Sequence, residues 1–135
     1  MTAEFDHQIR VYYEDTDAGG IVYHASYIRY AERGRTELLR HHGYQNSELL
    51  SEAGVLFVVR HMDIDFLKPA RLDDLLTVST SIGELRNSSL FMRQNIKHDT
   101  DIICSLRVGI VTVNQNARPV RIPEDLRTLF ETYTT

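Results

Sequence analysis

Hydrophobic residues recur along this chain with two different periods. Over residues 7–13 the apolar positions Ile9, Val11 and Tyr13 alternate with polar ones, as in a β-strand that buries one face. Over residues 25–41 they recur every three or four positions, which predicts one long helix. Its predicted buried stripe consists of Tyr27, Tyr30, Ala31, Gly34, Leu38 and His41. Because the centre of this stripe is small, we expect a sheet to approach the helix closely there.

Beyond the long helix the pattern is mainly that of strands. A short helix is expected over residues 47–53, before Gly54, and a long strand over residues 55–69, ended by Pro69. Three further segments, 74–86, 89–99 and 101–114, are separated by short turns and predict an antiparallel meander. Pro123 marks the start of a C-terminal helix.

This order of elements predicts an α+β fold in which one long helix covers one antiparallel sheet. The length of 135 residues favours a single domain spanning residues 1–135. One helix leaves sheet edges and part of a face uncovered, so we expect a homodimer or homotetramer.

Composition narrows the function classes. The chain is 42% hydrophobic and 25% charged, which is typical of a globular protein, and its net charge of −4 argues against general nucleic-acid binding. The single cysteine, Cys104, cannot form an internal disulfide, and the N-terminal residues carry no basic and apolar leader. No apolar run approaches the roughly 20 residues of a membrane span. We therefore expect a cytoplasmic protein.

The segment "EDTDAGGIVYH", which joins the first strand to the long helix, carries the candidate chemistry. It could be a solvated acidic turn. A calcium loop is excluded, because its position 5 is Gly19, which has no side-chain ligand, and its position 12 is Ser26 where a bidentate Glu is needed. A phosphotransfer pair formed by Asp15 and Asp17 would need the parallel sheet that this chain lacks. The fourth interpretation places a carboxylate beside the N–H groups of a helix start, an arrangement that suits hydrolysis of an activated acyl group.

Residues 10–40, "RVYYEDTDAGGIVYHASYIRYAERGRTELLR", resemble the signature of the hot-dog-fold acyl-CoA thioesterases. They are most similar to the Tol-Pal-associated branch, a relative of the 4-hydroxybenzoyl-CoA thioesterases, and "FVVRHMDIDFLKPARLDD" fits the same family. The resemblance implies a hot-dog fold, in which a five- to six-stranded antiparallel sheet wraps a long helix, with active sites at a dimer interface.

The resemblance also implies roles for individual residues. The catalytic carboxylate is Asp17, with Asp15 as its rival, and the backbone N–H at or next to His24 is the oxyanion donor. The His24 side chain is expected to orient Asp17 or line the pocket. Tyr13, Tyr23, Tyr27, Phe57 and Val58 are candidates for contact with the acyl group, and Arg86, Asn87, Ser88, Arg118 and Arg121 for contact with the CoA nucleotide.

The implied reaction is hydrolysis of an acyl-CoA to a free acid and CoA, without a metal or organic cofactor, since CoA is part of the substrate. An acyl-carrier protein is the alternative thiol carrier. From a different functional class, the chain could be a weakly catalytic or non-catalytic module that binds an acyl group or acyl-carrier protein in a cell-envelope complex.

Overall fold

The computed structural model describes residues 3–134. The strands are β1 (Phe5–Arg10), β2 (Leu56–Phe66), β3 (Leu75–Leu85), β4 (Ser89–His98) and β5 (Asp101–Val113). The helices are α1 (His24–His41), α2 (Asn46–Glu48), which continues into a π-helical turn (Leu49–Ala53), and α3 (Glu124–Glu131). A 3₁₀ turn (Tyr13–Asp15) follows β1.

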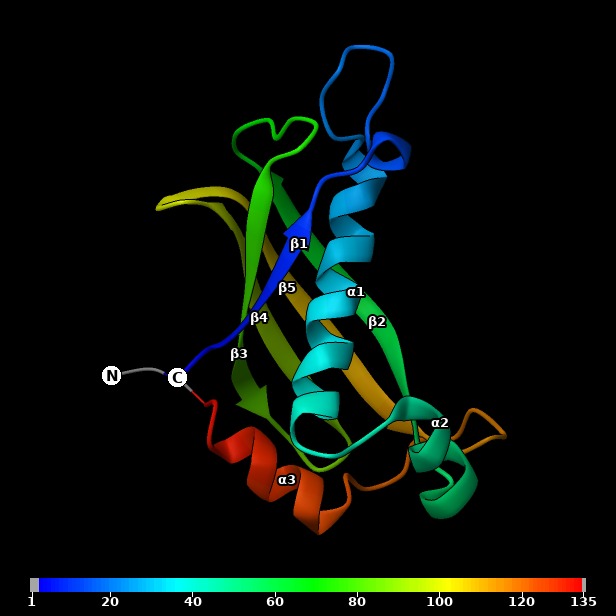
Figure 1. Cartoon of the computed structure of the whole chain (residues 1–135). Helices are drawn as coiled ribbons and strands as arrows, with labels where there is room; N and C mark the ends of the chain where they lie inside the picture. The colour runs from blue at the N-terminus through cyan, green and yellow to red at the C-terminus, as the bar shows by residue number, and fades with distance from the viewer. Residues whose placement is uncertain (1–2, 135) are drawn as a thin grey trace.

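The five strands form one antiparallel sheet in the order β1-β3-β4-β5-β2, so β1 and β2 are its edges. Helix α1 runs along one face of the sheet, α3 lies below its lower end, and the loop between β1 and α1 rises above its upper end (Figure 1). This arrangement confirms the predicted α+β plan and gives five strands within the described residues.

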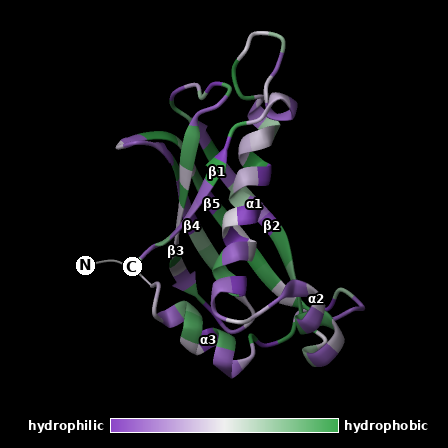
Figure 2. Ribbon diagram, viewed as in Figure 1, coloured by the Kyte–Doolittle hydropathy of each residue, from purple (hydrophilic) through white to green (hydrophobic). Residues whose placement is uncertain are grey.

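The core lies between α1 and the sheet. Most of the buried strand residues are apolar. Hydrophobic and hydrophilic positions both occur along the strands (Figure 2). Tyr30, Ala31, Gly34 and Leu38 of α1 are buried against them. A Cβ atom added to Gly34 would lie only 2.6 Å from Cγ1 of Val78 on β3, which explains why the predicted small centre of the helix is needed.

The boundaries of several predicted elements differ from the structure. β1 ends at Arg10, before the predicted strand does, and Tyr13 lies in the 3₁₀ turn with 82% of its surface exposed. His41, which the predicted stripe includes, is exposed, and its ring centre lies 5.4 Å from that of Phe5 on the edge strand β1. The helix begins at His24, one residue earlier than predicted.

A polar cluster joins α1 to the sheet inside the core. Gln94 of β4 is fully buried, and its Nε2 donates to the carbonyl of Ala31 at 2.8 Å and to Oγ1 of Thr80 at 3.0 Å. These two bonds orient the amide so that its Oε1 accepts from Nη1 of Arg35 at 3.0 Å. Glu32 and Arg35 are spaced i, i+3 on α1, a spacing that predicts an ion pair between them, but no such pair is found among residues 3–134.

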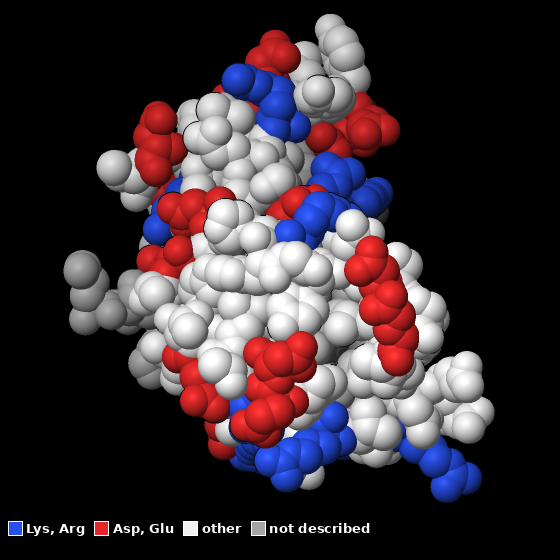
Figure 3. Space-filling model, turned by 60° about the horizontal axis from the view of Figure 1, so that its bottom comes forward, with Lys and Arg blue, Asp and Glu red and all other residues white. Residues whose placement is uncertain are grey.

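The face of the sheet away from α1 is polar. Arg93 of β4 and Arg107 of β5 are direct cross-strand neighbours there, and the Arg107 guanidinium lies 3.5 Å from the centre of the Phe91 ring. On the view with the lower end forward, acidic and basic residues are interspersed around an uncharged area (Figure 3). Within the described residues no helix combines the length and the apolar character needed to cross a membrane.

Candidate active site

Hydrogen bonds hold the loop between the 3₁₀ turn and α1 in one conformation. The Asp17 N–H donates to the carbonyl of Ile21 at 2.9 Å, and Gly20 returns a bond to the carbonyl of Asp17 at 3.0 Å. Gly20 has a φ of +78°, a backbone conformation that glycine adopts without strain. The Val22 N–H donates to the carbonyl of Ala70, which ties the loop to the segment that leads into β3. The loop is therefore a defined platform for Asp17.

The two aspartates of the motif occupy different environments. Asp15 is buried, and its Oδ2 accepts from the Tyr12 N–H at 2.9 Å. Its carbonyl accepts from the Tyr23 N–H at 2.8 Å and from the Ser26 hydroxyl at 3.2 Å, at the start of α1. Burial, and then the nearby Asp15 carboxyl group, raise the pKa of Tyr30. Asp15 thus holds the start of the helix in place.

Asp17, in contrast, is exposed. Its Oδ1 accepts from the Gly19 N–H at 2.8 Å, while no hydrogen bond to its other carboxylate oxygen is found within residues 3–134. The backbone N–H of His24, at the first position of α1, also has no acceptor in this part of the chain. Such N–H groups at a helix start attract negative charge. The geometry leaves Asp17, and not Asp15, free to contact a ligand.

Asp17 and His24 line one pocket of about 330 Å³. Its remaining walls are mainly apolar and include Tyr27 from α1, Phe66 from the end of β2 and Pro69. The ring centres of Tyr27 and Phe66 are 5.8 Å apart, and those of His24 and Phe66 are 6.2 Å apart. Burial raises the pKa of Tyr27, and its hydroxyl accepts from the Ala70 N–H at 3.1 Å. One pocket with aromatic walls is therefore lined both by Asp17, whose carboxylate is exposed, and by His24, whose N–H begins α1.

Two predicted acyl contacts, Tyr13 and Tyr23, do not line this pocket. Tyr13 contributes to a different hollow, beside Arg10 and Leu72. Tyr23 is 45% exposed, and its ring packs beside that of His24, with 4.4 Å between the ring centres. Tyr27 is the predicted aromatic residue that the structure brings into contact with the Asp17 pocket.

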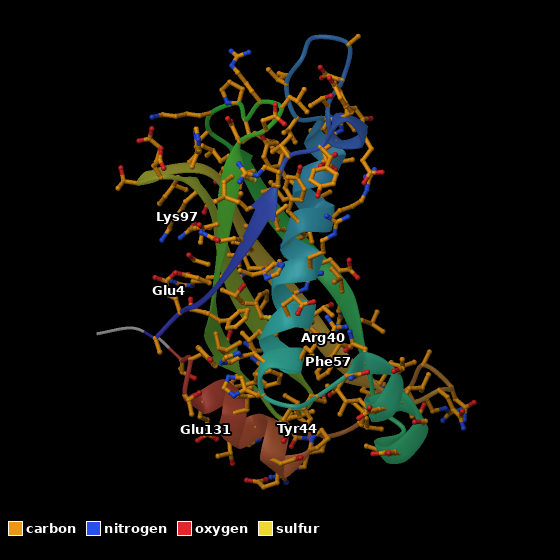
Figure 4. The ribbon with its side chains drawn as sticks, viewed as in Figure 1. Glu4, Arg40, Tyr44, Phe57, Lys97 and Glu131 are labelled. Atoms are coloured by element: carbon orange, nitrogen blue, oxygen red, sulfur yellow. The ribbon has the colours of Figure 1, made fainter. Side chains whose placement is uncertain are left out.

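The other predicted residues lie at the opposite end of the chain's fold. Phe57, at the start of β2, lies low in the molecule, far below the loop that carries Asp17 (Figure 4). It lines a second pocket, of about 270 Å³, between α1 and β2, whereas Val58 is exposed and does not line that pocket. Phe57 and Phe66 are nine positions apart on β2, which corresponds to roughly 30 Å along the strand. One chain therefore does not bring Phe57 to Asp17.

The predicted nucleotide contacts also lie at this lower end. Residues 86–88 form the turn between β3 and β4, and the Arg86 guanidinium pairs with Glu84 at 2.8 Å. Hydrogen bonds from α3 and β5 fix the backbone of this turn. The Arg127 guanidinium donates to the carbonyl of Asn87, and the Thr112 hydroxyl donates to the carbonyl of Ser88. Arg118 and Arg121 follow the lower end of β5, and Arg121 is 3.6 Å from Glu124.

Sequence reasoning missed several residues that line the Asp17 pocket, among them Phe66, Leu67 and Lys68. The available signal was their position at the end of a strand, directly before Pro69. Phe66 and Leu67 are 51% and 56% exposed despite being large and apolar, as expected for a binding surface.

Comparisons with known proteins agree with this architecture. Residues 19–105 match the model of the thioesterase superfamily. The chain belongs to the thioesterase superfamily. It is 43% identical to the acyl-CoA thioester hydrolase YbgC of Escherichia coli over 127 residues, which cover 93% of this chain and 94% of that protein. It is 39% identical to the acyl-CoA thioesterase YbgC of Haemophilus influenzae, with 93% of each chain covered.

The fold is shared with solved members of the superfamily. The crystal structure of a probable thioesterase from Bartonella henselae has a TM-score of 0.87 and 44% sequence identity, and the match covers 90% of this chain and all of that one. These matches identify the fold as the hot-dog fold and the protein as a thioester hydrolase. The matched range begins at Gly19, so it includes His24 and Tyr27 but starts two residues after Asp17.

Proposed function

We propose that this protein hydrolyses acyl-CoA thioesters to a free carboxylic acid and CoA, with Asp17 as the catalytic carboxylate and the His24 N–H as the oxyanion donor. The observation that carries the proposal is that one pocket is lined by Asp17, whose carboxylate is exposed, and by His24, whose N–H has no acceptor within residues 3–134. The names of the YbgC relatives support an acyl-CoA as the substrate.

The proposed reaction needs a nucleophile and a place for negative charge. As a general base, Asp17 takes a proton from water, and the water oxygen attacks the thioester carbonyl. As a nucleophile, it attacks directly and forms a mixed anhydride, which water then hydrolyses. On either route the carbonyl oxygen gains negative charge, which the His24 N–H stabilises. The carbon–sulfur bond then breaks, the thiolate of CoA leaves and takes up a proton, and no metal or organic cofactor takes part.

The edge position of β2 supports a site built from two copies of the chain. β2 is eleven residues long, and its outer edge has no partner strand within residues 3–134. Antiparallel pairing of two β2 strands about their midpoint would place Phe57 of one copy beside Phe66 of the other. Because Phe66 lines the Asp17 pocket, the lower-end residues of one chain would then complete the site of its partner. We propose this homodimer as the minimal active unit.

The same pairing of β2 strands also favours one thiol carrier for the substrate over the other. It would bring the turn at residues 86–88 and Arg118 of one copy toward the Asp17 pocket of the other, where they could meet the phosphates of CoA. Arg86 is already paired with Glu84, which makes Arg118 the stronger candidate. We therefore propose CoA as the carrier, and binding of an acyl-carrier protein is the alternative.

The decisive experiment measures CoA release from acyl-CoAs of increasing chain length by the wild-type protein, Asp17→Asn and Glu14→Gln. Glu14 is an exposed acid in the same segment, three residues before Asp17, so Glu14→Gln is the matched control. We expect Asp17→Asn to lower kcat by orders of magnitude and Glu14→Gln to leave it nearly unchanged. Equal turnover by Asp17→Asn and the wild type would refute the assignment, and uniformly absent turnover would favour the binding module.

A further inference from the structure

The second pocket, between α1 and β2, contains a cation that the proposed chemistry does not use. We call it the α1–β2 pocket. Its volume is about 270 Å³, and apolar side chains, among them Leu39, Phe57 and Phe130, form most of its wall. Glu32, Arg35 and Thr36 of α1 add three polar side chains on one side.

Arg35 is held in a fixed position at this pocket. Its Nη1 donates to Oε1 of Gln94, whose own orientation is set by the carbonyl of Ala31 and the hydroxyl of Thr80. This is the one hydrogen bond of the guanidinium found within residues 3–134, and no carboxylate lies within ion-pair distance there. Burial lowers the pKa of Arg35. A guanidinium has five N–H donors, so most of them stay available to a ligand in the pocket.

The position of this pocket relates it to the proposed site. Its β2 residues are Leu56, Phe57 and Val59, at the lower end of the strand. In the paired arrangement proposed above, this end lies beside Phe66 of the other copy, and therefore beside that copy's Asp17 pocket. An acyl group whose thioester lies at Asp17 would extend into the partner's α1–β2 pocket.

We propose that Arg35 makes the enzyme select acyl groups that carry an oxygen atom at their far end. The inference rests on the proposed function and on the pairing of β2. The apolar wall fits a hydrocarbon chain, and the guanidinium fits a hydrogen-bond acceptor at its tip. Glu32 lines the same pocket, and its negative charge offsets that of Arg35. A neutral hydroxyl or carbonyl oxygen is therefore favoured over a carboxylate.

A plain alkyl chain in this pocket would displace water from Arg35 without replacing the hydrogen bonds. Buried polar groups left without partners are the usual basis of strong discrimination against an analogue that lacks an oxygen. The selectivity would thus come from rejection of the alkyl chain as well as from attraction of the oxygen. Arg35 would be a specificity-determining residue and would take no part in the chemical step.

The test compares kcat/KM for ω-hydroxyacyl-CoAs and unsubstituted acyl-CoAs in pairs of six, eight and ten carbons. We expect the wild-type protein to prefer the hydroxylated member of at least one pair by roughly ten- to one-hundredfold, the range of one hydrogen bond to a charged group. The ω-carboxyl chain of the same length distinguishes a neutral acceptor from an anionic one. A carboxylate preferred over the hydroxyl would overturn the role assigned to Glu32.

Two variants assign the preference to Arg35. Arg35→Met should bring the ratio within each pair close to one, because kcat/KM should fall for the hydroxylated chain and rise for the unsubstituted chain. Arg33→Met, which removes an exposed cation two residues away, should keep the wild-type ratio. Because Arg35→Met leaves Oε1 of Gln94 unpaired, Arg35→Lys serves as a second variant that keeps a donor, and it should retain part of the preference.

The outcomes separate this inference from the proposed function. If unsubstituted chains are hydrolysed in an Asp17-dependent manner but no pair shows a preference for oxygen, the function stands and the role of Arg35 is refuted. The same holds if Arg35→Met keeps the full preference. If neither series is hydrolysed, the proposed function itself fails.

Discussion

The contact between Gly34 and the sheet makes a sharp prediction for Gly34→Ala. Alanine favours a helix by about 1 kcal/mol over glycine, so an exposed site would gain stability. Here the new methyl group would lie 2.6 Å from Cγ1 of Val78 and 3.2 Å from Nε2 of Gln94. Contacts below 3.0 Å cannot be kept, and Val78 belongs to an inner strand that cannot retreat.

The expected loss of folding stability combines a packing cost and a weakened hydrogen bond, less the gain in helix propensity. Overpacking costs about 1–3 kcal/mol, and lifting α1 would weaken the 2.8 Å bond from Gln94 to Ala31, worth about 1 kcal/mol. After the gain in helix propensity, the net destabilisation is about 1–3 kcal/mol, which lowers Tm by several degrees. Turnover should fall as well, because α1 carries the His24 N–H.

The measurement is urea unfolding of the wild type, Gly34→Ala, Val78→Ala and the double variant at one protein concentration. Val78→Ala removes the atom that the new methyl group would strike. It should therefore cost less in the Gly34→Ala background, by about 1 kcal/mol or more. A Gly34→Ala protein as stable as the wild type, or strictly additive effects in the double variant, would refute the close-contact explanation.

Three further predictions concern the site and its surroundings. Tyr27→Phe leaves the Ala70 N–H without its acceptor, so it should lower the free energy of unfolding in urea by about 1–3 kcal/mol and should also lower kcat. An unchanged unfolding curve would contradict a structural role for the Tyr27 hydroxyl. Burial raises the pKa of Cys104 from 9.0 to about 12, so the fold favours the protonated thiol. The contribution of the protonated Cys104 thiol to the free energy of unfolding is complete below pH 9 and is lost as the pH rises toward 12. At pH 8 a thiol reagent should therefore label Cys104 only in urea. Finally, mixing Asp17→Asn with Phe57→Lys subunits should restore up to about a quarter of wild-type activity. Half of the dimers would then be mixed, and each mixed dimer would have one intact site of its two. No recovery of activity would argue against a site shared between subunits.

The sequence predicted those features that depend on local pattern. The helical period located α1 to within one residue, and alternation located β2 to β5. The family motif placed Asp17 and His24, and the structure puts both in one pocket. Their catalytic roles remain predictions.

Features that depend on distant segments could not be predicted in this way. Alternation suggested that Tyr13 is buried, but the chain leaves the sheet after Arg10 and turns, which exposes the ring. Helical spacing suggested that Arg35 pairs with Glu32, but a buried amide 59 residues away competes for the guanidinium. The separation of Phe57 from Asp17 depends on the direction of β2 relative to α1, which no local pattern specifies.

The order of strands in the sheet also has a consequence for folding. β3, β4 and β5 are consecutive in the chain and pair as neighbours, so this meander can form early through local contacts. β1 and β2 must dock onto it from far along the chain, as the pairs Phe5–Thr80 and Leu56–Val113 indicate. These late strands carry the Asp17 loop and the proposed subunit contact. Partial unfolding should therefore open the active site while the centre of the sheet stays protected from hydrogen exchange.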